Sequence, residues 1–474
     1  MGKSRALKVC HVFAGTQGGQ WVCDQLERLS AEHGCEVTAV LGGAEGQTVD
    51  FCREAGIALH PFSFSFIGWR AFFTAPWAII KLAVWMRRQR FDVVQSHVIQ
   101  STLFARPAAW LADVPVRIEM VTGPYYMQAE STAWMERATA WMETGVVPSC
   151  NLTGELYRRA GISERLIQPT LYYGPDEERF DPARTRPAGL RNELGLAGDT
   201  PLIGSVALFY PKAPTSSFVP PEAQERHVKG HEELIRAMPL VLEEFPRAKL
   251  VLVGRGWGEA GEAAERELRD LVAALGLDDA VIFAGYRRDI AALYLDFDVS
   301  VQASLNDNLG GTVESLLMAC PTVATRVGGL VDSVVDGETG ILVEPDNPAD
   351  LARGILRLLR DTEEARRLGA AGRRRMLEGF TLRTTAAGLA GLYRRQRAEA
   401  AGAWRLHVSI ARLFLAMVLH VPVLGRAVLV DFYLRAVVPG LWYAARGRFG
   451  AFVWKLEKRV RPSRQPAAPS DVAA

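Results

Sequence analysis

The segment 304–321 holds the residue types best suited to chemistry. It reads SLNDNLGGTVESLLMACP and follows a strand-like run, DVSVQAS. Asp307 and Glu314 lie on either side of the paired glycines Gly310 and Gly311. Carboxylates accept hydrogen bonds from vicinal sugar hydroxyls, and glycine N–H groups at a helix start can hold a phosphate. This layout predicts a site for a diphosphate that joins two sugars, as in a nucleotide diphosphate sugar.

Two further candidates follow early strand-like runs. Gly15, Gly18 and Gly19 come directly after the first run, where glycines let backbone N–H groups approach an anion. The loop GTQGGQ does not match the G-x-G-x-x-G dinucleotide pattern, so a simple tight turn stays an alternative. His97 ends the run FDVVQSH. We expect its ring to point toward a cleft and donate to a phosphate or sugar hydroxyl, with a purely structural hydrogen bond as the alternative.

Lys229 stands before a helix-like segment, next to Gly230. A lysine at this position suits a phosphate clamp. Arg226 lies three residues earlier and is either a second phosphate ligand or a solvated loop charge. The preceding segment 209–228 is long and proline-rich for a strand-to-helix loop, and loops of this length are often functional lids.

Two series of strand-like and helix-like segments position these residues. Strand, glycine loop, helix and strand open the chain, which is the start of a doubly wound sheet. The expected strands are 7–14, 36–43, 91–97, 114–121, 201–208, 248–256, 280–286, 297–304 and the start of 321–329. We therefore predict an α/β protein of two Rossmann-like domains that face one another across a cleft. The predicted boundaries are 1–180, 181–385, a returning helix at 386–400, and an extension at 401–474.

Composition sets the remaining bounds. The chain has 474 residues, is 49% hydrophobic and 23% charged, and carries a formal charge of +2. Its six cysteines are scattered without a C-x-x-C pair, so we expect neither a zinc site nor a disulfide framework. The start, MGKSRALKVCHVF, lacks the apolar region of a signal peptide. These features favour a reducing cytosol.

Two segments combine aromatic, apolar and basic residues. Segment 401–474 carries 11 Lys and Arg side chains against three Asp and Glu, and charged residues interrupt every apolar run before it could span a bilayer. Segment 61–91 has nine aromatics, five basic residues and no acid. Such stretches suit an amphipathic helix in the headgroup region of an anionic membrane. Packing in a protein core is the alternative for both.

The motifs together resemble the retaining glycosyltransferases of family 4, which have the GT-B fold. The resemblance covers about residues 6–398 and is most specific at 201–350. It rests on the following motifs: GTQGG, the strand-end histidine, the YYGPD linker turn, KGHEELIRA, LVLVGRG, AGYRRDIAALYLDFDVSV and SLNDNLGGTVESLLMACPTVATRVGGLVDSVVDGETGILVEPDNPADLA.

The resemblance assigns roles to single residues. It implies that Glu314 binds the nucleotide ribose and that Lys229 binds the donor diphosphate. His97 would lie near the transferred sugar, and Arg287 would lie where the base is contacted. The catalytic residues it implies are His97, Lys229, Asp307 and Glu314. The donor-binding residues it implies are Gly18, Gly19, Arg226, Lys229, Arg287, Asn308, Leu309, Gly310, Gly311, Thr312 and Glu314.

The sequence departs from the family at two places. Asn306 occupies the usual position of the first acid, and Asp307 is its candidate replacement. The usual arginine partner of Lys229 falls near Leu208, with Arg226 and Lys212 as candidate replacements.

The resemblance further implies transfer with retention of configuration, without a metal or other cofactor. The expected partners are a nucleotide-sugar donor, a lipid-linked or other saccharide acceptor and an anionic membrane surface, and no nucleic acid. We expect a cytoplasmic protein on the inner face of the cell membrane, acting in bacterial surface polysaccharide or glycolipid synthesis. Three alternatives stay open: a sugar-nucleotide epimerase, a catalytically silent scaffold subunit, and a soluble transferase with a small acceptor such as a sugar phosphate. A two-carboxylate hydrolase fits less well, because the acids flank an anion site and do not face each other across a bond.

Overall fold

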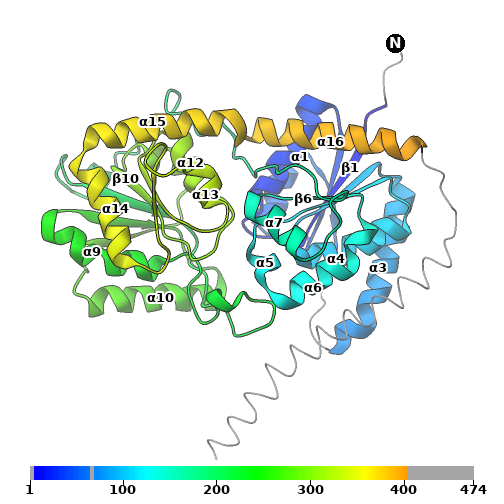
Figure 1. The fold of residues 1–474 in the computed structure, drawn as a ribbon, viewed down its shortest axis with the longest axis horizontal. Coiled ribbons are helices and arrows are strands. Elements are labelled where there is room, and N and C mark those ends of the chain that lie inside the picture. The colour runs from blue at the N-terminus through cyan, green and yellow to red at the C-terminus, as the bar shows by residue number, and fades with distance from the viewer. Residues whose placement is uncertain (1–4, 65–68, 403–474) are drawn as a thin grey trace, which may run out of the picture.

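Two parallel six-stranded sheets form the molecule. The computed structural model describes residues 5–64 and 69–402, so the predicted extension at 401–474 lies outside the described residues except for its first two. The strand orders are β3-β2-β1-β4-β5-β6 and β12-β11-β10-β7-β8-β9, the same doubly wound topology in both halves. Figure 1 shows the two halves side by side. The predicted fold class, an α/β protein of GT-B type, is confirmed.

Apolar, β-branched runs form the N-terminal sheet, and helices cover both of its faces. The strands are β1 (Lys8–Phe13), β2 (Glu36–Leu41), β3 (Ala58–Pro61), β4 (Val93–Ser96), β5 (Val116–Met120) and β6 (Gly145–Val147). The helices are α1 (Gln20–His33), α2 (Gln47–Glu54), α3 (Trp69–Gln89), α4 (Val98–Leu111), α5 (Tyr125–Gln128), α6 (Glu130–Thr139), η1 (Ala140–Met142) and α7 (Asn151–Arg159). In register, β1 residue Val12 pairs with Val40 on one side and Ser96 on the other.

The C-terminal half repeats this plan. Its strands are β7 (Leu202–Val206), β8 (Lys249–Val253), β9 (Val281–Gly285), β10 (Val299–Gln302), β11 (Thr322–Thr325) and β12 (Ile341–Val343). Its helices are α8 (Leu190–Glu193), η2 (Pro221–Ala223), α9 (His231–Glu244), α10 (Gly258–Ala274), α11 (Ile290–Tyr294), α12 (Thr312–Leu317), α13 (Leu330–Ser333), α14 (Pro348–Arg360) and α15 (Thr362–Gly379). In doubly wound sheets, ligands bind beyond the carboxyl ends of the strands, and these are the ends that carry the candidate residues of both halves.

Two crossings of the chain join the halves. Helices α15 and α16 (Leu382–Gly402) lie end to end along both halves (Figure 1). Helix α16 packs on the N-terminal half, where the Tyr393 hydroxyl donates to Gln95 Oε1 at 2.6 Å. The other crossing contains Gly174, where a Cβ atom would lie 2.2 Å from the carbonyl carbon of Thr381. Only glycine permits the two crossings to approach this closely.

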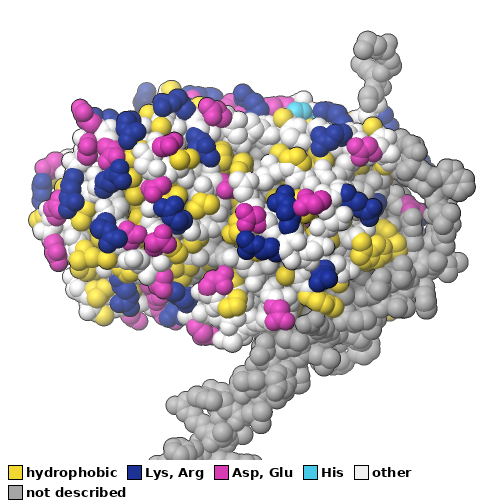
Figure 2. Space-filling model, in the orientation of Figure 1, with side chains coloured by type: hydrophobic (Ala, Val, Ile, Leu, Met, Phe, Trp, Pro, Cys, Tyr) yellow, Lys and Arg dark blue, Asp and Glu magenta, His cyan; other side chains and the backbone are white. Residues whose placement is uncertain are grey.

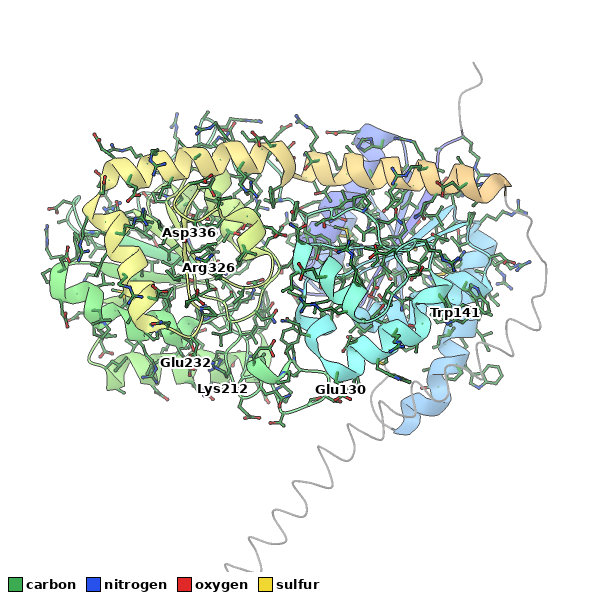
Figure 3. All side chains as sticks on the ribbon, viewed as in Figure 1. Glu130, Trp141, Lys212, Glu232, Arg326 and Asp336 are labelled. Carbon is green, nitrogen blue, oxygen red and sulfur yellow. A yellow bond between two sulfur atoms is a disulfide. The ribbon has the colours of Figure 1, made fainter. Side chains whose placement is uncertain are left out.

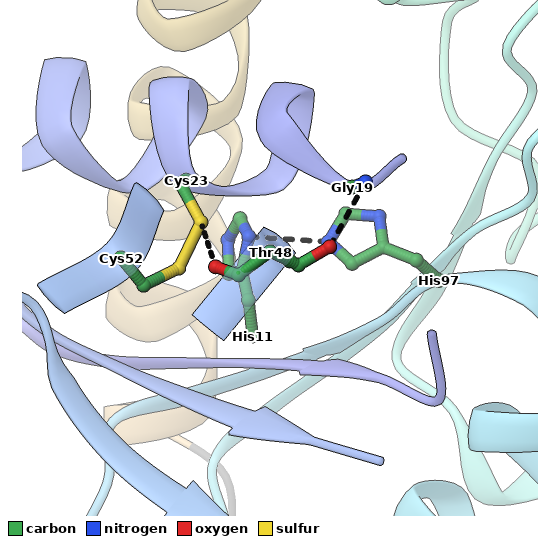
Figure 4. The surroundings of a disulfide bond; sticks show 6 residues. All are labelled: His11, Gly19, Cys23, Thr48, Cys52 and His97. Atoms are coloured by element: carbon green, nitrogen blue, oxygen red, sulfur yellow. Dashed lines mark hydrogen bonds between the residues drawn. A yellow bond between two sulfur atoms is a disulfide. The ribbon is translucent and has the colours of Figure 1, made fainter. Parts of the chain in front are cut away.

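One pair of cysteines corrects the sequence-based prediction. Cys23 on α1 and Cys52 on α2 form a disulfide, although we predicted none (Figure 4). The two residues are 29 positions apart and carry no motif, because the connection through β2 brings the two helices together. The other four cysteines are free and buried.

Helix α3 occupies most of the basic aromatic segment 61–91. Some of its residues pack in the core and others are exposed. Leu82 and Met86 are buried, whereas Trp77 is 67% exposed and Val84 is 44% exposed. Over the part of the chain that the structure describes, no helix has the length and apolarity needed to cross a bilayer.

Candidate active site

A cavity of about 500 Å³ lies between the two halves. The N-terminal half contributes Gly18 from the loop after β1 and Trp21 from α1. The C-terminal half contributes a set of predicted site residues from the loop before α9 and the loop after β10. That set is Lys229, Asp307, Asn308, Leu309, Gly310 and Glu314. The structure therefore brings most of the predicted residues to one chamber.

Lys229 and Asp307 form an ion pair inside this cavity. The Lys229 ammonium donates to Asp307 Oδ2 at 2.6 Å, and Ser304 Oγ donates to the same oxygen at 2.8 Å. Burial alone would lower the pKa of Lys229, but the Asp307 carboxylate outweighs burial and raises it. Lys229 is therefore a cation at neutral pH, and its charge faces the chamber.

Glu314 lies in the first turn of α12, with its carboxyl group partly open to the cavity. Burial raises the pKa of Glu314 to about 7, against the opposing effects of the Arg179 guanidinium and the Tyr294 hydroxyl. A carboxyl group held this way can accept a pair of hydrogen bonds from vicinal hydroxyls.

A second cavity of about 350 Å³ adjoins the first at Glu314. Arg287 lines it, together with Tyr286 and Arg288. Hydrogen bonds that Arg287 donates to Asp289 and Glu193 raise the pKa of Arg287. These carboxylates hold the guanidinium at 2.7 Å from each of them, so Arg287 is placed at the wall of this cavity.

His97 is placed differently from the prediction. Its side chain is fully buried, and one ring nitrogen lies 3.1 Å from His11 Nδ1 (Figure 4). The other lies 2.9 Å from the Tyr173 hydroxyl. Burial lowers its pKa, and so does the neighbouring His11. Trp21 and Tyr173, which contact the ring, line the cavity. The expectation that the His97 ring faces the cleft is therefore wrong for this conformation, and its role near the sugar stays a prediction.

The glycines and Thr312 divide into cavity-lining and structural positions. Gly18 lines the cavity with φ at +65°, whereas the Gly19 N–H group donates to Thr48 Oγ1 at 3.0 Å. The Gly311 N–H group likewise donates to Gln302 Oε1 at 3.3 Å. Thr312 is buried, and its hydroxyl bonds to Leu309 O and Ser333. Of the predicted glycines and Thr312, Gly18 and Gly310 line the cavity in this conformation.

Neither predicted replacement for the missing arginine reaches the chamber. Arg226 pairs with Asp346 and with Glu233 Oε1, the latter at 2.7 Å. Lys212 pairs with Glu267 at 3.2 Å and lies 3.7 Å from Glu232, and Figure 3 shows Lys212 and Glu232 close together in the C-terminal half. Both residues are held outside the two cavities.

The position of the missing first acid is also structural. Asn306 is buried, and its amide donates to Gln128 Oε1 at 2.6 Å. Asn308 accepts from Ser149 Oγ at 3.2 Å. Both contacts join the loop after β10 to the N-terminal half. Across the described ranges, no group of three His, Cys, Asp or Glu side chains is placed to hold a metal ion.

Among the lining residues that sequence reasoning missed, three have ionisable side chains from three different elements. Asp24 on α1 faces the chamber, where burial raises its pKa to about 6 against the opposing charge of Arg179. Arg179 comes from the linker turn and lines both cavities. Tyr210 comes from the long loop after β7. The linker motif YYGPDEERF was noted as a turn, but nothing in it indicates which of its side chains reaches the cleft.

Family models match both halves of the chain. The model for glycosyl transferases group 1 matches residues 220–375, and the glycosyl transferase 4-like domain matches residues 17–194. Together, one model for each half of the chain, they support a glycosyltransferase of the group 1 type. The matched residues include the loop after β1, Lys229 and the segment from Asp307 to Glu314.

Curated relatives in this family are moderately similar. One, named D-inositol 3-phosphate glycosyltransferase, from Stackebrandtia nassauensis, is 30% identical over 321 residues, covering 66% of this chain and 65% of the relative. The putative glycosyltransferase EpsD of Bacillus subtilis is 34% identical over 157 residues, covering 33% of this chain and 40% of the relative. The matches thus span slightly less than two thirds of the first relative's length and less of the second.

Solved structures share the fold of this chain. Anabaena Alr3699/HepE in complex with UDP has a TM-score of 0.67 at 19% identity, and the match covers 82% of this chain and 100% of that chain. Sucrose-phosphate synthase from Thermosynechococcus elongatus has a TM-score of 0.66 at 21% identity, covering 83% and 100%. At these identities, the likeness supports the two-domain architecture alone.

Proposed function

We propose that this chain transfers a sugar from a nucleotide diphosphate sugar to a saccharide or polyol acceptor. The observation that carries the proposal is the pair of adjoining cavities that meet at Glu314, with Lys229 in the larger one. A nucleotide that spans both would place its base near Arg287, its ribose on Glu314 and its diphosphate near Lys229. Binding of UDP and of UDP-glucose by the structurally similar Alr3699/HepE is consistent with this placement.

The proposed chemistry relies on the charge of the leaving group. The bond from the anomeric carbon to the diphosphate breaks, and its electron pair leaves with the diphosphate. The Lys229 cation is placed to stabilise that charge in a partly buried site, where such interactions are strong. We propose retention of configuration and no metal requirement, so turnover should persist in a chelator such as EDTA.

The preferred acceptor is lipid-linked, which would place the enzyme at the inner face of the membrane in surface polysaccharide or glycolipid synthesis. Helix α3 supports this assignment, because Trp77, Lys81, Val84 and Arg88 are all exposed at helical spacing along it. Figure 2 shows charges of both signs interspersed over the C-terminal half, and a hydrophobic area on the N-terminal half, where Figure 3 labels Trp141. Trp141 is 41% exposed. Exposed tryptophans beside basic residues suit the headgroup region.

A small phosphorylated acceptor is the second candidate. The name of the Stackebrandtia relative points to an inositol phosphate, and a chain that acts on such a soluble acceptor has no need of a membrane surface. Deleting residues 403–474 separates the two. Under the lipid proposal the truncated protein leaves membranes and loses transfer to lipid acceptors, whereas transfer to a small acceptor would be retained.

The test is release of nucleoside diphosphate from a panel of nucleotide sugars. Wild type and Glu314→Ala are compared alone, with bacterial membrane extract, and with inositol phosphate. Release that requires an acceptor and collapses in the variant supports transfer and identifies the acceptor class. Turnover of the donor to an isomer without acceptor would indicate an epimerase, and no binding of any donor would indicate a silent scaffold subunit.

A further inference from the structure

The two cavities share three lining residues: Gln20, Arg179 and Glu314. These residues mark the junction through which any nucleotide that occupies both cavities must pass. Arg179 is the basic member of the three. A ligand with its ribose on Glu314 places its phosphates next to this junction, on the side of the larger chamber.

Positive charge is scarce in the larger chamber. Lys229 and Arg179 are the only basic residues among its described lining residues, whereas four of them are acidic: Asp24, Asp176, Asp307 and Glu314. Lys229 is already paired with Asp307 at 2.6 Å. Arg179, by contrast, has no carboxylate within ion-pair distance among the residues that the structure describes. The charge of Arg179 is therefore available to an incoming anion.

The position from which a neighbouring cation would be expected is apolar. Leu208, just after β7, lines the smaller cavity. Arg226 and Lys212, the two candidate replacements, are paired elsewhere and line neither cavity. Arg179 thus remains the basic side chain that can approach the diphosphate from the junction.

The turn that carries Arg179 is anchored on both sides. The Arg28 guanidinium on α1 donates to Asp176 Oδ1 at 3.0 Å. The backbone N–H groups of Arg179 and Phe180 donate to Asp176 O at 3.2 and 3.1 Å. Phe180 is buried in the core of the C-terminal half, and the Arg179 Cζ atom lies 5.5 Å from its ring centroid. The linker therefore presents this side chain from a fixed base, even though the side chain itself is exposed.

We propose that Arg179, from the linker between the halves, supplies the second positive charge for the donor diphosphate, alongside Lys229. The inference rests on the proposed function and names a residue that acts in the same site. When the anomeric carbon–oxygen bond breaks, its electron pair passes to the diphosphate. The acceptor oxygen forms the new bond, and its proton leaves on the diphosphate. Arg179 stabilises the charge of the leaving group and is unchanged by the reaction.

The test compares Arg179→Met and Arg179→Lys with Arg184→Met. Arg184 is a matched control, an exposed arginine of the same linker that pairs with Glu178 at 3.1 Å. Calorimetry measures binding of UDP, GDP and ADP and of the corresponding nucleosides. Arg179→Met should weaken nucleoside diphosphate binding by about 10- to 100-fold and leave nucleoside binding unchanged, because only the phosphates contact the guanidinium. Turnover should fall by about 100-fold, with partial recovery in Arg179→Lys.

Two results would overturn the inference while the proposed function stands. One is that wild type, Arg179→Met and Arg184→Met all bind a nucleoside diphosphate equally well. The other is Arg226→Met bearing the phosphate-specific loss instead. A wild type that binds none of the nucleoside diphosphates overturns the proposed function itself. Thermal unfolding of both Arg179 variants should match wild type, since Arg179 is exposed and makes no described ion pair.

Discussion

Two clusters of charged side chains in this molecule differ in their access to a cavity: one is fully buried, or closed, and the other lines the cleft between the halves. Arg106 on α4 is 1% exposed and bonds to Glu119, Glu136 and Glu143 at 2.9, 2.8 and 3.0 Å. The Thr139 hydroxyl accepts a further bond from it at 2.6 Å. In the cleft, Lys229 and Asp307 are also paired, but they line a cavity with Glu314.

The difference separates structural charge from functional charge. In the closed cluster, every Arg106 bond is made within one half of the protein, and no bond is offered to a ligand. In the cleft cluster, the carboxyl of Glu314 and the guanidinium of Arg179 face the space between the halves. Burial perturbs both clusters, raising the pKa of Glu136 to about 8 and that of Glu314 to about 7. A perturbed pKa therefore marks a ligand site only where the group also opens to a cavity.

The largest expected effect comes from opening the closed cluster. Arg106→Met leaves three buried carboxyl groups without their cation, which should lower the free energy of unfolding by about 3–5 kcal/mol. Urea unfolding measures the change, with Arg184→Met as a control near zero. The activity of the fraction that remains folded should be unchanged. Unaltered unfolding in Arg106→Met would show that the cluster contributes nothing to stability.

The next largest effect concerns the cleft, where we expect activity to be lost while stability is kept. Lys229→Met removes a cation from the proposed diphosphate site, so kcat/KM should fall by about 100- to 1000-fold. The melting temperature should change little, because Asp307 keeps its bonds from Ser304 and from the Asn308 N–H group. Steady-state kinetics measure the loss. Lys212→Met is the matched control, since Lys212 is ion-paired outside both cavities, and an equal loss in that variant would contradict the assignment.

The smallest effect concerns the pH dependence of stability. Because burial raises the pKa of Glu314 to about 7, its ionisation destabilises the folded state as the pH rises from about 4.5 to above 7. Glu314→Gln cannot ionise and escapes this loss. The melting temperature of the variant relative to wild type should therefore increase between pH 5 and pH 8, as scanning calorimetry can show. A difference that is constant with pH would mean that Glu314 is not perturbed.

The sequence predicted the sheets and much of the site, for reasons that are local. Apolar runs ending in polar or glycine residues predicted most of the strands, and the segment from Asp307 to Glu314 lies at a strand end, where its side chains meet Lys229. The strands β3, β6 and β12 were not expected; each has three or four residues and lies at the edge of its sheet.

The remaining features depend on how the two halves pack. Whether Arg226 or Arg179 reaches the chamber is decided by the path of the linker and by the partners Asp346 and Glu233. The burial of His97 depends on Trp21 and on Tyr173 from the linker. The Cys23–Cys52 disulfide likewise arises from helix packing. None of these contacts leaves a periodic or spacing signal in the chain.

A crystal structure with a bound nucleoside diphosphate would show which residues hold the donor. UDP, GDP and ADP would each be tried, followed by the nucleotide sugar that the enzyme turns over. We expect the base in the cavity lined by Arg287, the ribose hydroxyls on Glu314, and the diphosphate between Lys229 and Arg179. A nucleotide bound elsewhere, or one whose phosphates contact neither cation, would contradict this placement.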